Sequence, residues 1–146
     1  MAGVNEIAVW CLLFVASVTD LAWGKIYNAL TLPFFAFGIL FHLANHDFSP
    51  TAIGVAAILF FPLYFLKVIA AGDVKLLLAF AAWMNSAWVL QLAAVSIVIG
   101  ASVGFFILAR KGKLDFKKGL TKMPLAPAFL CAYAFLKVAE MKGWNL

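Results

Sequence analysis

The sequence predicts an all-α membrane protein, folded as a bundle of about six transmembrane helices. Of its 146 residues, 66% are hydrophobic and 12% are charged, and the mean hydropathy is +1.06. A water-soluble domain could not bury that much apolar surface. The apolar residues also form long uncharged stretches between short charged or turn-forming segments, as membrane-spanning helices require. We therefore expect one transmembrane domain over residues 1–146, with no soluble domain.

The uncharged stretches give the order of the helices. The first is expected to end at Asp20, and the turn-rich segment 45–50 separates the second from the third. Residues 76–109 carry no charge and would measure about 51 Å as one helix at 1.5 Å per residue, longer than a hydrocarbon core of about 30 Å. This stretch must therefore turn back, most readily at the polar pair Asn85 and Ser86. The predicted helices cover about residues 4–19, 30–45, 51–69, 74–84, 87–109 and 124–140.

The basic residues orient these helices. Nine of the 11 Lys and Arg residues fall in alternate connections, and the positive-inside rule assigns that side to the cytoplasm; only Lys137 and Lys142 run against the rule. We therefore expect a multi-pass protein of the inner (cytoplasmic) membrane with both termini outside. Residues 1–9 contain Glu6 and no basic residue, so no cleavable export signal is expected. The orientation depends on Lys25, Lys67, Lys75, Arg110, Lys111, Lys113, Lys117, Lys118 and Lys122.

Two acidic residues are the candidates for chemistry. Asp20 follows the first predicted helix and Asp73 precedes the fourth, so the topology puts both carboxylates at the cytoplasmic face. Two carboxylates that share a site are expected to hold one proton between them. The ionised member can then take a proton from a water that attacks a peptide carbonyl, while the protonated member binds the carbonyl oxygen. Two structural alternatives stay open: Asp73 as a helix cap, and Asp20 paired with Lys25.

The cysteines are not expected to take part in chemistry. Cys11 and Cys131 each lie in an apolar segment, without a CxxC spacing or a nearby histidine. We expect both to be core residues. No metal, cofactor or nucleic acid is expected to bind.

Three segments carry a resemblance to a known family. Residues 20–31 read Asp-Leu-Ala-Trp-Gly-Lys-Ile-Tyr-Asn-Ala-Leu-Thr, residues 70–77 read Ala-Ala-Gly-Asp-Val-Lys-Leu-Leu, and residues 123–129 read Met-Pro-Leu-Ala-Pro-Ala-Phe. In this order they resemble the two active-site segments and the start of the last helix of type IV prepilin peptidases, which are intramembrane aspartyl proteases with a Gly-x-Gly-Asp motif. Ala70 stands at the first glycine of that motif, and Tyr27 stands at a proline of the first segment.

The resemblance implies an activity and a set of site residues. It implies metal-independent cleavage of the leader peptide from prepilin-like substrates on the cytoplasmic side, with Asp20 and Asp73 as the catalytic pair. It also implies that four motif residues lie near the substrate, namely Asn28, Ala70, Gly72 and Lys75. The chain is similar to the compact peptidase-only branch that serves tight-adherence pili or archaeal-type filaments, so methyltransferase activity is not carried over.

The basic segment 110–122 is expected to bind anionic lipid headgroups, which contribute about 1 kcal/mol per charge. A second interpretation is that Lys113, Lys117 and Lys118 steer the acidic part of a prepilin toward the site.

Two functions of other classes remain as alternatives. A proton- or cation-coupled transporter subunit would use the acids as a relay, and would lose transport without showing proteolysis when either acid is neutralised. A non-catalytic pilus-assembly protein would keep its function in those variants and would depend on the basic segment instead.

Overall fold

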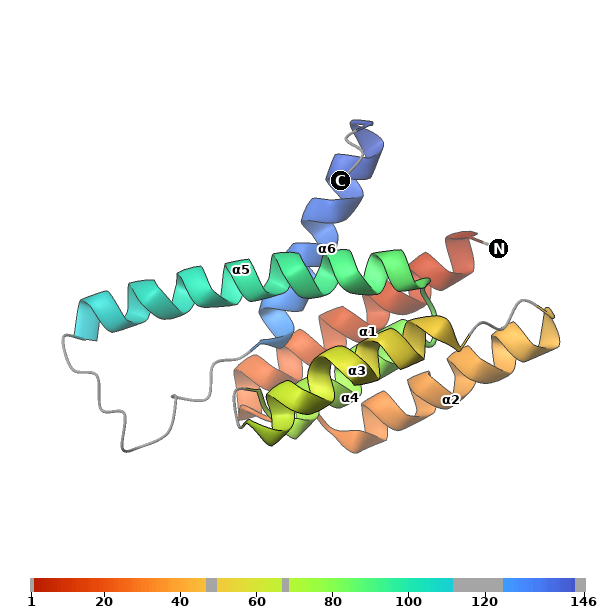
Figure 1. Ribbon diagram of the computed structural model, residues 1–146, viewed down its shortest axis with the longest axis horizontal. Coiled ribbons are helices and arrows are strands. Elements are labelled where there is room, and N and C mark those ends of the chain that lie inside the picture. Colours follow the sequence, from red (N-terminus) through yellow and green to blue (C-terminus); the bar gives the residue numbers. More distant parts are fainter. Residues whose placement is uncertain (1, 47–49, 67–68, 112–124, 144–146) are drawn as a thin grey trace.

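The computed structural model describes residues 2–46, 50–66, 69–111 and 125–143, with only the backbone described at residue 2 and at residues 104–111. Over these ranges it is all-α with six helices, which confirms the predicted helical class and number of helices (Figure 1), while two of the six are long and apolar enough to cross a membrane. The helices are α1 (Ala2–Trp23), α2 (Asn28–Ala44), α3 (Thr51–Phe65), α4 (Ala71–Ala81), α5 (Ser86–Lys111) and α6 (Ala126–Met141).

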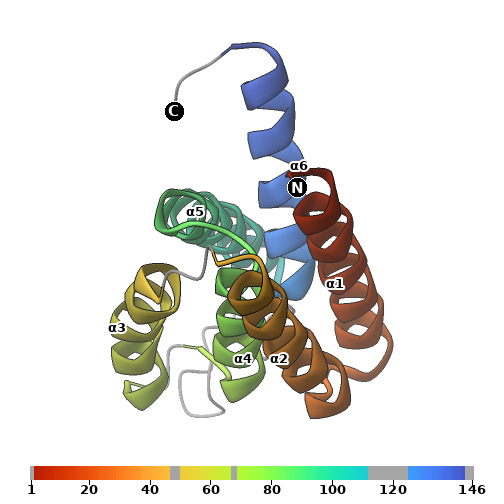
Figure 2. The same ribbon diagram turned by 90° about the vertical axis from the view of Figure 1, so that its right-hand side faces the viewer.

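The first five helices run roughly along one axis in alternating directions, and α6 crosses α1 and α5 steeply (Figure 1). The alternation brings the C-terminal ends of α1 and α3 and the N-terminal ends of α2 and α4 to the same end of the molecule. The view down this axis shows α4 between its neighbours (Figure 2). We call the end that holds residues 20–28 and 70–73 the motif end.

The short helix α4 lies at the centre of the packing. Seven of its 11 residues are buried, among them Leu76, Leu77 and Phe80, which are at most 1% exposed. It packs mainly against α2 and α3, while α1 and α5 both pack against α6. A helix of this length gains little stability by itself, so burial among its neighbours holds it in place.

The contact between α2 and α4 depends on Gly38. A Cβ atom at Gly38 would lie 2.8 Å from the indole nitrogen of Trp83 and 2.9 Å from Cβ of Ala82. The same indole nitrogen donates a hydrogen bond of 2.9 Å to the carbonyl oxygen of Phe34. The absence of a side chain at Gly38 therefore allows the close approach of the two helices.

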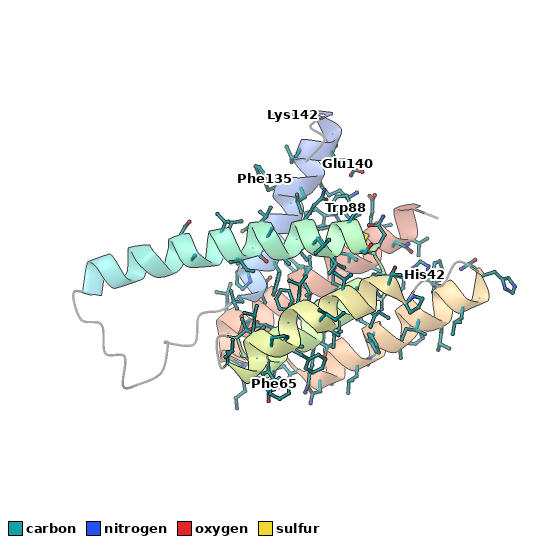
Figure 3. All side chains as sticks on the ribbon, in the orientation of Figure 1. His42, Phe65, Trp88, Phe135, Glu140 and Lys142 are labelled. Atoms are coloured by element: carbon teal, nitrogen blue, oxygen red, sulfur yellow. The ribbon has the colours of Figure 1, made fainter. Side chains whose placement is uncertain are left out.

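The opposite end is held by a group of charged residues. Lys137 of α6 pairs with Glu6 of α1 at 2.7 Å and with Glu140 at 2.8 Å, and its ammonium lies 4.6 Å from the ring centre of Trp88. Trp88 and Glu140 lie beside each other where α5 and α6 meet (Figure 3). Lys137 is thus paired with two carboxylates.

Much of the outer surface is apolar. Ile7 is 66% exposed, Ile58 77% and Phe65 75%, and Phe65 and Phe135 point away from the body of the molecule (Figure 3). Residues 3–23 of α1 and 86–103 of α5 are long and apolar enough to cross a membrane, whereas α2 and α3 are shorter apolar helices.

The prediction that both cysteines are core residues is wrong, because Cys11 and Cys131 are exposed. The outer faces of this chain are themselves apolar, so apolar neighbours in the sequence do not indicate that a cysteine is buried.

The helix ends differ from the predicted ones near both acids. The first helix does not stop at Asp20 but continues to Trp23, and α4 begins at Ala71, so Asp73 lies inside its first turn. Gly24, at φ +61°, ends α1 and donates its N–H to the carbonyl oxygen of Asp20 at 2.8 Å. Glycine takes this left-handed conformation without steric cost, so it, and not the acid, ends the helix.

Candidate active site

Both candidate acids line a single cavity at the motif end. The cavity has a volume of about 580 Å³. Asp20 and Leu21 come from the last turn of α1 and Asp73 from the first turn of α4. The connection between α1 and α2 lines another side of the cavity. The remaining lining residues are Gly24, Lys25, Ile26, Tyr27, Asn28, Ala70 and Gly72.

Asp20 is partly exposed and is joined to the start of α6. Its Oδ2 accepts a hydrogen bond from the backbone N–H of Ala126 at 3.3 Å, across 106 positions of the chain. Ala126 is the first residue of α6, where a backbone N–H has no partner within its own helix. Among the described residues, no ion pair joins Asp20 to Lys25, the structural alternative considered above.

Asp73 is 4% exposed and lies at the third position of α4. Its Oδ2 accepts a hydrogen bond from the backbone N–H of Ala70 at 3.2 Å, so it does cap the helix. In the part of the chain that the structure describes, neither carboxylate makes a second hydrogen bond. The Oδ1 atoms of Asp20 and Asp73 therefore remain available to a water or a substrate.

The connection between α1 and α2 lies directly against the start of α4. A Cβ atom at Gly72 would lie 3.2 Å from Cβ of Ile26, closer than most side-chain contacts. Lys75 Nζ donates a hydrogen bond of 2.9 Å to Asn28 Oδ1 on the exposed side of the same contact. The two motif segments thus meet at two contacts, Gly72 with Ile26 and Lys75 with Asn28. The cavity lies between Asp20 of the first segment and Asp73 of the second.

Only some of the other predicted site residues line the cavity. Asn28, Ala70 and Gly72 line the cavity, whereas Lys75 reaches it only through Asn28. Lys113, Lys117 and Lys118, the candidates for substrate steering, lie outside the described residues. Over the described ranges, no group of three or more His, Cys, Asp or Glu side chains could hold a metal ion.

Sequence reasoning missed the contact of Ser17 with Ala126. Ser17 Oγ lies 2.7 Å from the carbonyl oxygen of Leu13 and 3.0 Å from that of Ala126. The available signal was spacing, because Ser17 precedes Asp20 by three residues and so shares its helix face. Nothing in the local sequence indicates that α6 covers this face.

The fold and the cavity define a class of protein: a helical chain with apolar outer faces that brings two acidic side chains to one end. Residues 7–105 match the model of the type IV leader peptidase family, and this match covers more than half of the 146 residues. The chain therefore belongs to the type IV leader peptidase family, a family of membrane proteins. The matched residues include both acids and end before α6. No curated protein and no solved structure matches the chain.

Proposed function

We propose that this protein is an intramembrane aspartyl endopeptidase that removes the leader peptide from type IV prepilin-like substrates at the cytoplasmic membrane face. The observation that carries the proposal is the single cavity lined by both Asp20 and Asp73. Membership in the type IV leader peptidase family supports the reaction type. The substrates are membrane proteins whose leader precedes an apolar helix.

The two acids would act as a pair. Because two neighbouring carboxylates ionise together only at high cost, one is protonated in the active form. The ionised acid takes a proton from the attacking water, and the protonated acid donates a hydrogen bond to the scissile carbonyl oxygen. Each acid is anchored through Oδ2 to a helix N-terminus, which leaves Oδ1 to face the water and the substrate. The mechanism needs no metal or cofactor.

The membrane placement follows from the apolar faces. We propose that residues 1–146 form one domain in the inner membrane, with six helices crossing it and both termini outside. The two long apolar segments of α1 and α5 support this, as do the exposed Ile7, Ile58 and Phe65. The motif end, with Lys25 and Lys75, would then face the cytoplasm, as the positive-inside rule requires.

The substrate would enter as an extended chain. Gly72 and Ala70 present little side chain to the cavity, which allows the substrate backbone to come close to Asp73. Asn28, fixed by Lys75, offers polar atoms at the cavity edge. The basic segment 110–122 would bind anionic headgroups, and Lys113, Lys117 and Lys118 would draw the acidic part of the prepilin toward the cavity.

The test is co-expression with candidate small type IV prepilins. Cleavage is followed by the mass of the pilin, for the wild type and for Asp20→Asn and Asp73→Asn. We expect both variants to accumulate in the membrane and to leave the prepilin uncleaved, since the amide can neither accept the proton of water nor share one with its neighbour. Glu140→Gln, the same change at an exposed acid of the opposite end, should cleave normally. Full processing by either Asp variant would refute the peptidase assignment.

A further inference from the structure

The start of α6 is held by two side chains of α1 that both contact Ala126. The N–H of Ala126 donates to Asp20 Oδ2 at 3.3 Å, and the carbonyl oxygen of Ala126 accepts from Ser17 Oγ at 3.0 Å. Ser17 and Asp20 are three residues apart on α1 and so point to the same side of the helix. The polar groups of one backbone residue thus bridge a buried hydroxyl and a candidate catalytic carboxylate.

We propose that Ser17 is a positioning residue for Asp20 and acts through the backbone of Ala126. This rests on the proposed function, because it assumes that Asp20 is catalytic. The Ser17 hydroxyl holds the carbonyl oxygen of Ala126 against α1. Because the helical backbone of the first turn of α6 joins the two groups, this contact also keeps the N–H of Ala126 beside Asp20. That N–H in turn fixes Oδ2 of Asp20, so that Oδ1 is directed toward the cavity.

The hydroxyl of Ser17 does not need α6 for its own hydrogen bonding. Its single hydrogen lies within reach of two carbonyl oxygens, that of Leu13 at 2.7 Å, which is the acceptor that a serine within a helix commonly uses, and that of Ala126 at 3.0 Å, so the two acceptors share it. Ser17 is nonetheless 4% exposed and lies against Ala126, which is fully buried. The contact with α6 is therefore additional to the local one, and it joins α1 to α6 next to Asp20.

Ala126 has little room to move away from this contact. The preceding residue, Leu125, packs closely on α5: a Cβ atom at Gly100 would lie 3.1 Å from its Cδ2. Asp20 has only this one hydrogen bond among the described side chains and backbone groups. Loss of the Ser17 hydroxyl should consequently loosen the one hydrogen-bond donor that holds Asp20 within the described residues.

The experiment measures cleavage of a purified small prepilin by the full chain in detergent, with Ser17→Ala, Ser17→Thr and Ser96→Ala beside the wild type. Ser96 is the matched control, since it is 1% exposed and, within the described ranges, its hydroxyl bonds only the carbonyl oxygen of Ala93 in its own helix. We expect Ser17→Ala to lower kcat about tenfold and to change KM less than twofold. Ser17→Thr, which keeps the hydroxyl, should restore most of kcat.

Three results would overturn the positioning role of Ser17. They are an unchanged kcat in Ser17→Ala, an equal loss of kcat in Ser96→Ala, or a folded Ser17→Thr that is as slow as Ser17→Ala. Unfolding midpoints of all variants are measured in the same detergent, so that a general loss of folding is seen directly. Asp20→Asn is assayed in parallel: if it is inactive while Ser17→Ala is normal, only the role of Ser17 fails. If Asp20→Asn cleaves, the peptidase assignment itself fails.

Discussion

Asp20 and Asp73 share a mode of attachment that their positions in the chain do not reveal. Each uses Oδ2 to accept a hydrogen bond from a backbone N–H at the start of a helix, Asp20 from α6 and Asp73 from α4. Helix N-termini carry partial positive charge and stabilise a nearby carboxylate. Two acids stabilised in this way can line the same cavity, even though Asp73 is buried. The capping role of Asp73 and the catalytic role proposed for it are thus compatible, because they use different oxygen atoms.

Gly72 offers a test of how closely the connection between α1 and α2 must lie against α4. In Gly72→Ala the new Cβ would lie 3.2 Å from Cβ of Ile26 and would displace the connection by a few tenths of an ångström. We expect the protein to remain folded, with a stability change of about 1 kcal/mol or less, and kcat for prepilin cleavage to fall about tenfold. The control is Gly54→Ala in α3, where a Cβ meets nothing within 4 Å. Wild-type cleavage by Gly72→Ala would show that the cavity tolerates this shift.

At the scale of elements, the packing of α4 against its neighbours determines where Asp73 lies. It packs against α2 and α3, and Gly38 of α2 lies against Ala82 and Trp83, directly after the end of α4. The hydrogen bond from Trp83 to the carbonyl oxygen of Phe34 marks the far end of this contact. Any change in the spacing of α2 and α4 would also change the cavity, because Asn28 and Asp73 lie at the other end of the same two helices.

Gly38→Ala should therefore destabilise the fold. The added methyl would overlap the indole of Trp83 and the backbone oxygen of Ala82, which lies 3.0 Å from the ideal Cβ position. We expect a loss of about 1–3 kcal/mol in the free energy of unfolding, as is usual for overpacked interiors. Urea unfolding in detergent measures it, and the emission of Trp83 should shift in the folded state. Gly54→Ala again serves for comparison and should be neutral or slightly stabilising. Equal stability of the two variants would contradict the close contact.

For the whole molecule, the sequence predicted the class, number and order of the helices, because charge and turn residues interrupt the apolar stretches at every connection. It placed both acids at one end through the alternation of helix direction alone. It did not predict that Gly24 ends α1 beyond Asp20, since a charged residue is a weaker stop than a left-handed glycine. The contact of Asp20 with Ala126 joins residues 106 positions apart, and no local pattern encodes such a partner.

The two cysteines test whether lipid covers the apolar outer faces. Cys11 and Cys131 are exposed on the surface of the protein. If the chain lies in a bilayer as proposed, a water-soluble maleimide should not label them in intact membranes, because lipid keeps the reagent away from both thiols. Labelling should appear after denaturation in detergent. As a control, Lys142→Cys, at an exposed position near the C-terminus, should be labelled from outside the cell membrane without detergent. Rapid labelling of Cys11 in membranes would contradict the placement.

The 11-residue length of α4 has a consequence for the depth at which Asp73 would lie in a membrane. At 1.5 Å per residue this helix measures about 16 Å, roughly half of a hydrocarbon layer of about 30 Å. If all six helices cross the membrane, α4 spans only part of the layer, and because its neighbours cover it, Asp73 would lie below the level of the lipid headgroups. The thickness of the bilayer would then change the free-energy barrier that a leader peptide crosses to reach the two acids. The same chain would therefore cleave at a different rate in membranes with longer acyl chains.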